Sequence, residues 1–241
     1  MRVLRWMLAA ALWPGMAVAE CRDTVFEDQS YTICEVAAGD DLRLFHSGPD
    51  GVYGSFGAVD SALEAEGRQL VWAMNAGMYH ADLAPVGLYV ENGAEQSGLV
   101  TRDGPGNFGL LPNGVFCAGD RFAVIESRRF AEARPGCRYA SQSGPMLVIG
   151  GDLHPRFIPS SPSLNIRNGV GVSADGTRAV FAISNRPVNF HTFARFFRDA
   201  LGLPEALYFD GSISRLYAPD LGRRGGGFAI GPIVGVVGAR G

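Results

Sequence analysis

Polar side chains border several apolar runs in this chain, and their types suit a binding or catalytic site. Asp210 ends the apolar run at 207–209, and Arg167 lies just before the run that begins at Val170. A carboxylate can act as nucleophile, general base or electrostatic stabiliser, and a guanidinium can bind an anion through two parallel hydrogen bonds. The alternative is structural: each residue is a turn former beside a strand, and Arg167 pairs with Asp210.

Other polar residues have the same placement at the ends of apolar runs. They are Asn75, Gln142, Ser143, Ser184 and Asn185. If the strands share one sheet, these ends converge on one rim and face a common cleft. His80 follows Asn75 in the same loop, where an imidazole could carry a proton near neutral pH.

The elements that must hold these residues are mostly short strands. Apolar runs around turn residues predict hairpins over 86–100, 114–127 and 168–184, with Asn92-Gly93 suiting a tight turn. Continuous apolar runs predict buried strands at 69–75 and 204–210, and the glycine-rich end at 222–238 predicts a flexible loop and a closing strand. Apolar spacing predicts a helix over 55–67 and another capped by Asn189 and ended by Gly202. The pattern predicts a single α+β domain over 20–241, mostly antiparallel or mixed sheet.

The first residues have the features of a secretory signal peptide. Arg2 and Arg5 precede an apolar stretch at 6–16, and Ala17-Val18-Ala19 supplies a small-x-small cleavage motif. The stretch is too short for a membrane anchor. We therefore expect residues 1–19 to be removed and the protein to be periplasmic or secreted. The net charge of −3 gives no basic surface for nucleic acid.

Four cysteines in an exported chain favour two disulfides. Three pairings are possible, and the local ones are Cys21–Cys34 and Cys117–Cys137. Zinc binding or free thiols are the alternative, but no pair has the C-x-x-C spacing of a zinc knuckle.

Five ordered blocks resemble the phosphodiester glycosidase domain family. They are "MNAGMYHADLAPVGLYVENG" (74–93), "NFGLLPNGVF" (107–116), "QSGPMLV" (142–148), "IRNGVGVSADG" (166–176) and "VNFHTFARFFRDALGLPEALYFDGSISRLY" (188–217). Members of the family include an enzyme that removes N-acetylglucosamine from a sugar-phosphate diester. Many members carry Asp-Gly-Gly before serines, whereas here Gly211 is followed directly by Ser212, as in the shorter bacterial branch.

The resemblance implies an exported hydrolase that cleaves the glycosidic C1–O bond of a sugar-1-phosphodiester or a related envelope glycan. Asp210, Arg167 and His80 would be catalytic: Asp210 at C1, Arg167 on the phosphate and His80 as proton carrier. The expected substrate-binding residues are Asn75, Gln142, Ser143, Asn185, Ser212 and Ser214.

Two other functions remain open from the sequence. One is a periplasmic glycan-binding module without turnover, and the other is a metal-assisted phosphodiesterase that uses Asp210. We predict no cofactor or metal ligand set, although a divalent cation stays possible in the second case, and the oligomeric state is not predicted.

Overall fold

The computed structural model describes residues 20–211 and 213–241, so the predicted signal peptide (1–19) and Ser212 lie outside the described residues. The described residues form three antiparallel sheets and a two-stranded ribbon, β4 (Ser47–Gly48) with β5 (Gly51–Val52). The first sheet has seven strands, in the order β1 (Cys21–Phe26), β2 (Gln29–Ala37), β15 (Arg178–Ser184), β14 (Asn168–Val172), β16 (Glu205–Asp210), β12 (Met146–Ile149) and β13 (Asp152–Leu153).

The other two sheets have five strands each among the described residues. The second runs β10 (Phe122–Glu126), β9 (Gly114–Ala118), β11 (Tyr139–Ser143), β7 (Tyr89–Glu91) and β8 (Ala94–Ser97). The third runs β18 (Arg223–Arg224), β17 (Leu216–Ala218), β6 (Arg68–Asn75), β19 (Ile233–Ala239) and β3 (Leu42–Phe45). The predicted α+β class and the three predicted hairpins are confirmed.

The polar strand ends do not share a single sheet, so the condition under which the sequence placed them on one rim of one sheet is not met. Arg167, Ser184 and Asp210 border strands of the first sheet, Gln142 and Ser143 end a strand of the second, and Asn75 ends β6 of the third. Hairpin pairing is local and can be read from turn residues, whereas the pairing of distant strands leaves no local pattern.

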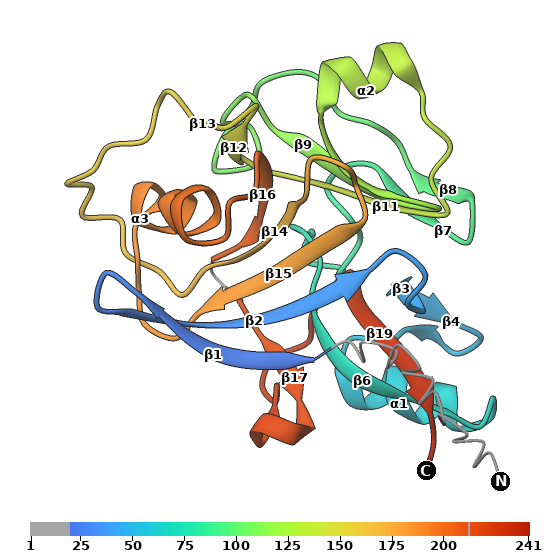
Figure 1. The fold of residues 1–241 in the computed structure, drawn as a ribbon. Coiled ribbons are helices and arrows are strands. Elements are labelled where there is room, and N and C mark those ends of the chain that lie inside the picture. Colours follow the sequence, from blue (N-terminus) through green and yellow to red (C-terminus); the bar gives the residue numbers. More distant parts are fainter. Residues whose placement is uncertain (1–19, 212) are drawn as a thin grey trace, which may run out of the picture.

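Helices cover the outer faces of the sheets. Helix α1 (Phe56–Glu64) packs on β6 and β19, α2 (Ser127–Ala133) on the second sheet, and α3 (Phe190–Arg195) on the first, as Figure 1 shows. Ser55 caps α1 by accepting a hydrogen bond from the Ala58 backbone, and Asn189 caps α3 through Thr192. The second predicted helix is not α-helical throughout, since it continues as a π-helical turn over Phe196–Ala200. A 3-10 turn, Pro219–Leu221, follows β17.

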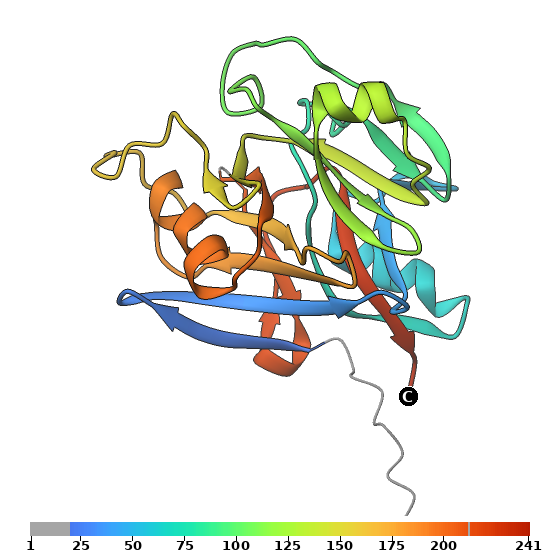
Figure 2. The same ribbon diagram turned by 45° about the horizontal axis from the view of Figure 1, so that its top comes forward.

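The inner faces of the three sheets meet in one apolar core. The core joins Phe181 and Phe209 of the first sheet to Phe116 of the second and Trp72 of the third, all at most 1% exposed. Figure 2, turned toward the top of the molecule, shows the three sheets grouped around this centre. Burial of aromatic side chains of this size is a major favourable contribution to folding.

Both predicted disulfides are confirmed. Cys21–Cys34 joins β1 to β2, and Cys117–Cys137 joins β9 to the segment that leads into β11. Structural disulfides are typical of oxidising compartments and therefore consistent with an extracytoplasmic protein. Within the described ranges, no helix is long and apolar enough to cross a membrane.

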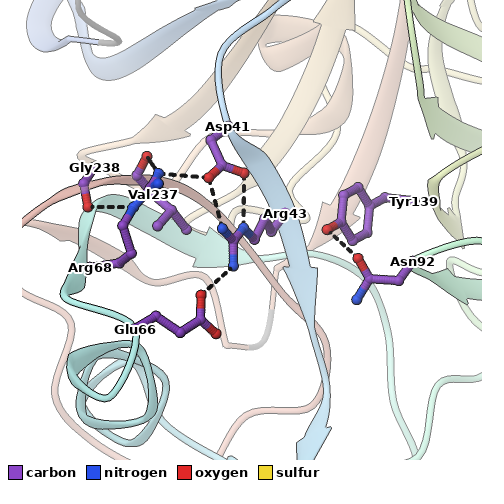
Figure 3. Close-up of polar contacts among 8 residues, drawn as sticks. All are labelled: Asp41, Arg43, Glu66, Arg68, Asn92, Tyr139, Val237 and Gly238. Atoms are coloured by element: carbon purple, nitrogen blue, oxygen red, sulfur yellow. Dashed lines mark hydrogen bonds and ion pairs between the residues drawn. The ribbon is translucent and has the colours of Figure 1, made fainter.

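A polar network ties the strands of the third sheet together at the end away from Asn75 (Figure 3). Asp41 accepts two hydrogen bonds of 2.8 Å from Arg43 and one of 2.7 Å from Arg68. Arg68 also donates to the backbone carbonyls of Val237 and Gly238. Hydrogen bonds from the Arg43 guanidinium hold the pKa of Asp41 below its usual range.

Candidate active site

Asn168 joins the first sheet to the third at the ends of their strands. Its side-chain oxygen accepts a hydrogen bond of 3.1 Å from the Asp210 backbone nitrogen. Its side-chain nitrogen donates to the backbone carbonyl of Asn75 at 2.7 Å and to the Asn75 side-chain oxygen at 3.1 Å. Both asparagines are completely buried, so these bonds satisfy groups that water cannot reach. The site is therefore built where two sheets meet.

The turn after Asp210 is fixed by hydrogen bonds within the same cluster. The Ser214 hydroxyl lies within hydrogen-bond distance of the backbone carbonyls of Asp210 (2.8 Å) and Ile166 (2.9 Å) and can donate its one proton to either. The Asp210 carboxylate accepts from the Gly211 backbone at 2.5 Å, and the Arg215 backbone donates to the Asn75 side chain at 2.9 Å. Asp210 is 9% exposed, so its carboxylate is held at the edge of the core.

Arg167 is completely buried beside this cluster. Its Nε donates to the Val188 carbonyl (2.8 Å) and its Nη2 to the Ser163 carbonyl (3.0 Å). The guanidinium carbon lies 3.7 Å from the centre of the Phe190 ring, a cation–π contact. Among the described residues, Arg167 forms no ion pair, and its Nη1 has no hydrogen-bond partner. Burial lowers the pKa of Arg167, because the charged form loses hydration.

The charges of Arg167 and Asp210 both act on the Tyr208 hydroxyl. The guanidinium carbon lies 5.4 Å from the centre of the Tyr208 ring. Burial raises the pKa of the Tyr208 hydroxyl; the positive charge of Arg167 lowers it and the negative charge of Asp210 raises it further. The hydroxyl also lies against the Cα of Gly211, in the space that a Cβ would need. Any larger residue at position 211 would therefore collide with Tyr208.

Two residues that the sequence did not single out, Tyr79 and Arg215, lie near this cluster: the Arg215 backbone binds Asn75, and the charge of Asp210 acts on Tyr79. Burial raises the pKa of Tyr79, the Asp210 carboxylate raises it further, and the Arg215 guanidinium lowers it. Both charges therefore act on the Tyr79 hydroxyl. Tyr79 and Arg215 are adjacent to predicted residues in the blocks 74–93 and 188–217, but their spacing alone carries no signal.

Several predicted substrate-binding side chains are engaged inside the protein. The Gln142 side chain accepts from the Leu88 and Val100 backbones and donates to Val100 and Ser127. The Ser143 hydroxyl donates to the Phe209 carbonyl at 2.8 Å.

The Asn185 side chain donates a hydrogen bond to the Ser30 hydroxyl and accepts one from the Arg223 guanidinium. His80 lies exposed on a turn, where its backbone bonds to Ala84 and Leu83. The contributions of these residues to substrate binding stay predictions, as does that of Ser212.

Residues 68–227 match the sequence model of a family described as phosphodiester glycosidase. The chain is also 36% identical over 219 residues to the uncharacterized protein YigE of Escherichia coli K12, a match that covers 88% of this chain and 84% of YigE. The chain belongs to the phosphodiester glycosidase family. The matched residues include Asn75, Arg167, Asn168, Asp210 and Arg215, so the buried cluster lies wholly in the family region.

A solved structure has a similar fold. The catalytic domain of zebrafish N-acetylglucosamine-1-phosphodiester alpha-N-acetylglucosaminidase, auto-inhibited by its pro-peptide, superposes with a TM-score of 0.61 at 13% identity. The match covers 92% of this chain and 85% of the zebrafish chain. Membership in the phosphodiester glycosidase family supports a glycosidase-type hydrolase.

Proposed function

We propose that this protein is an exported hydrolase that cleaves the C1–O bond of a sugar-1-phosphodiester. The observation that carries the proposal is the position of Asp210, a carboxylate at the end of a buried strand, fixed by Asn168 and Ser214 inside the family-matched region. Function is assigned from this site, because a shared fold alone does not imply a shared reaction.

In the proposed reaction, water attacks C1 and the electron pair of the C1–O bond leaves with the phosphate. The sugar gains the hydroxyl, the other proton of the water passes to the phosphate or to solvent, and the aglycone keeps the phosphate as a monoester. Positive charge develops at C1 in the transition state. Asp210 stabilises that charge from the end of β16, where its own position is fixed by internal hydrogen bonds.

Arg167 provides a buried positive charge against Tyr208, the residue two positions before Asp210. Two of its nitrogens are held by backbone carbonyls, and its Nη1 has no partner among the described residues. In the proposed mechanism this guanidinium stabilises the departing phosphate, because a preorganised buried charge needs no reorientation during the reaction. Phosphate is a good leaving group, so the demand for a general acid such as His80 is small.

The zebrafish enzyme is named for N-acetylglucosamine-1-phosphodiesters, and we take this substrate class as the first to test. An envelope glycan with the same linkage is the substrate that suits an exported protein. The disulfides support export.

Hydrolysis of a methyl phosphodiester of N-acetylglucosamine in ¹⁸O-labelled water tests the proposal. Cleavage at C1–O leaves the methyl phosphate unlabelled, whereas cleavage at P–O puts the label in the phosphate and overturns the assigned roles. A parallel assay with a chelator tests the metal-assisted alternative. Binding without turnover by the wild-type protein would instead support a glycan-binding module.

A further inference from the structure

The glycine-rich segment 225–231 is hydrogen-bonded to two side chains near the Asp210 cluster, those of Arg215 and Tyr79. The Phe228 carbonyl accepts a hydrogen bond from Arg215 Nη1, and the Ala229 carbonyl accepts one from the Tyr79 hydroxyl at 3.3 Å. Tyr79 is the residue whose pKa responds to both Asp210 and Arg215. The Arg215 backbone also donates to the Asn75 side chain, which is bound to Asn168 and through it to Asp210, so the segment borders the candidate active site.

Gly227 allows this segment to lie directly on Arg215. A Cβ at position 227 would lie 2.5 to 3.1 Å from the guanidinium atoms, and the φ of +134° is a conformation that other residues rarely adopt. One face of the Arg215 guanidinium is thus covered by backbone. This explains the glycine by close packing rather than by the flexible loop expected from the sequence.

Some hydrogen-bond donors of the Arg215 guanidinium have no partner among the described residues. Within residues 20–211 and 213–241, its side chain makes no ion pair, and only its Nη1 has a hydrogen bond. Arg167, by contrast, is completely buried. Arg215, which is only half-buried, is therefore the more accessible of the two guanidinium groups, and its nitrogens without a hydrogen bond suit a phosphate oxygen.

Phe228 is the most exposed large apolar residue of the described chain, at 83%. Its backbone is fixed by Arg215, while its ring lies in solvent. We propose that Arg215 and Phe228 form the aglycone subsite of this enzyme: Arg215 binds the phosphate, and Phe228 packs against a ring of the group esterified to it. This inference rests on the proposed function for its place in the reaction.

The surroundings favour a ring over an alkyl chain. Phe228 follows three glycines and its backbone carbonyl binds the Arg215 side chain, so the proposed subsite has one flat apolar ring and polar neighbours. An alkyl chain would need a continuous apolar patch. A pyranose or an aromatic ring has a flat face of the right size and hydrogen-bonding edges.

Binding of phosphate monoesters tests the subsite without any turnover. We would measure affinities of methyl phosphate, glucose 6-phosphate, phenyl phosphate and octyl phosphate by calorimetry, for the wild type, Phe228→Ala and Arg215→Gln. A ring stacked on Phe228 should give about fivefold tighter binding than methyl phosphate. Phe228→Ala should remove that difference, and Arg215→Gln should weaken every ester about tenfold, because a charge-assisted bond is lost.

The comparison between glucose and phenyl esters identifies the kind of ring, and Val25→Ala on β1 is the matched control for loss of an exposed apolar side chain. Equal affinities for methyl and ring esters, or a ring preference that persists in Phe228→Ala, would overturn the proposal. Octyl phosphate binding tightest, and depending on Phe228, would show an alkyl subsite and also overturn it. If the labelled-water assay shows no hydrolysis but the ring preference holds, the proposed function fails and the subsite remains.

Discussion

The side-chain oxygen of Asn168 accepts a hydrogen bond from the backbone nitrogen of Asp210, at 3.1 Å. The two residues lie opposite one another on β14 and β16, where the register shifts between Asn168 and Gly169. Because Asn168 also binds Asn75 on the third sheet, the position of the acid depends on an amide that holds two sheets together.

We expect Asn168→Ala to destabilise the protein and to lower turnover. The change leaves the Asp210 nitrogen and the Asn75 carbonyl buried without their partner, a cost of about 3 kcal/mol in the free energy of unfolding. Urea unfolding measures the cost, and Ser173→Ala in an exposed hairpin turn is the control. A loss below about 1 kcal/mol would show that the amide bridge contributes little.

Asp210→Asn should lower kcat by about a thousandfold on a sugar-1-phosphodiester, while the free energy of unfolding falls by no more than about 1 kcal/mol. The asparagine oxygen can still accept the hydrogen bond from the Gly211 backbone, but it carries no charge for C1. Steady-state kinetics and unfolding of the same preparations check both statements. A folded variant with wild-type kcat would remove Asp210 from the mechanism.

The local parts of the fold could be predicted from the sequence. Asn92 and Gly93 both adopt positive φ in the predicted turn, and Phe56, Val59 and Leu63 form the buried face of the predicted helix. These features depend on residues close together in the chain, where spacing and turn chemistry are informative.

The arrangement of the site could be predicted only in part. The strand ends pointed to Asp210 and Arg167. They did not show that both charges act on Tyr208, because a tyrosine in an apolar run resembles any core aromatic. Strand β11 was missed because it reads Tyr-Ala-Ser-Gln-Ser, yet all five residues are buried. Its polar groups are satisfied by partners far away in the chain, such as Phe209 for Ser143.

Arg167→Lys should destabilise the protein by about 3 kcal/mol, because it breaks the bonds of a buried charge. A lysine cannot donate to the Val188 and Ser163 carbonyls at once while stacking on Phe190. Arg121→Lys, at an exposed arginine bonded to the Asp175 carbonyl, is the control, with an expected change within about 0.5 kcal/mol. Equal stability of the two variants would contradict the structural role of Arg167.

Removal of the Cys117–Cys137 disulfide should lower the free energy of unfolding by about 3 kcal/mol on the chain-entropy model, given a sequence separation of 20. The double variant Cys117→Ala/Cys137→Ala is compared with wild type by urea unfolding, without reductant. Addition of a reductant should then destabilise the wild type more than the variant, which keeps only Cys21–Cys34. The same response to reductant in both proteins would argue against a stabilising Cys117–Cys137 bond.

Glu91→Gln should stabilise the protein at neutral pH. One Glu91 oxygen accepts hydrogen bonds from the Tyr89 hydroxyl (2.9 Å) and the His46 backbone (3.2 Å), and a glutamine oxygen can accept both. Burial raises the pKa of Glu91 in the folded protein, so the fold binds the proton more tightly than the unfolded chain does. Stability of the wild type therefore falls as pH rises from about 4 through the raised pKa, because the folded state must lose a proton that it favours.

Glutamine carries no charge, so the free energy of unfolding of the Glu91→Gln variant does not fall with pH for this reason. The gain of Glu91→Gln should be largest above the raised pKa and disappear below about pH 4, where the glutamate is protonated in both states. Urea unfolding from pH 4 to 8 checks this, with Glu95→Gln on exposed β8 as the control. A gain that did not change with pH would show that the effect is packing and not the cost of a buried charge.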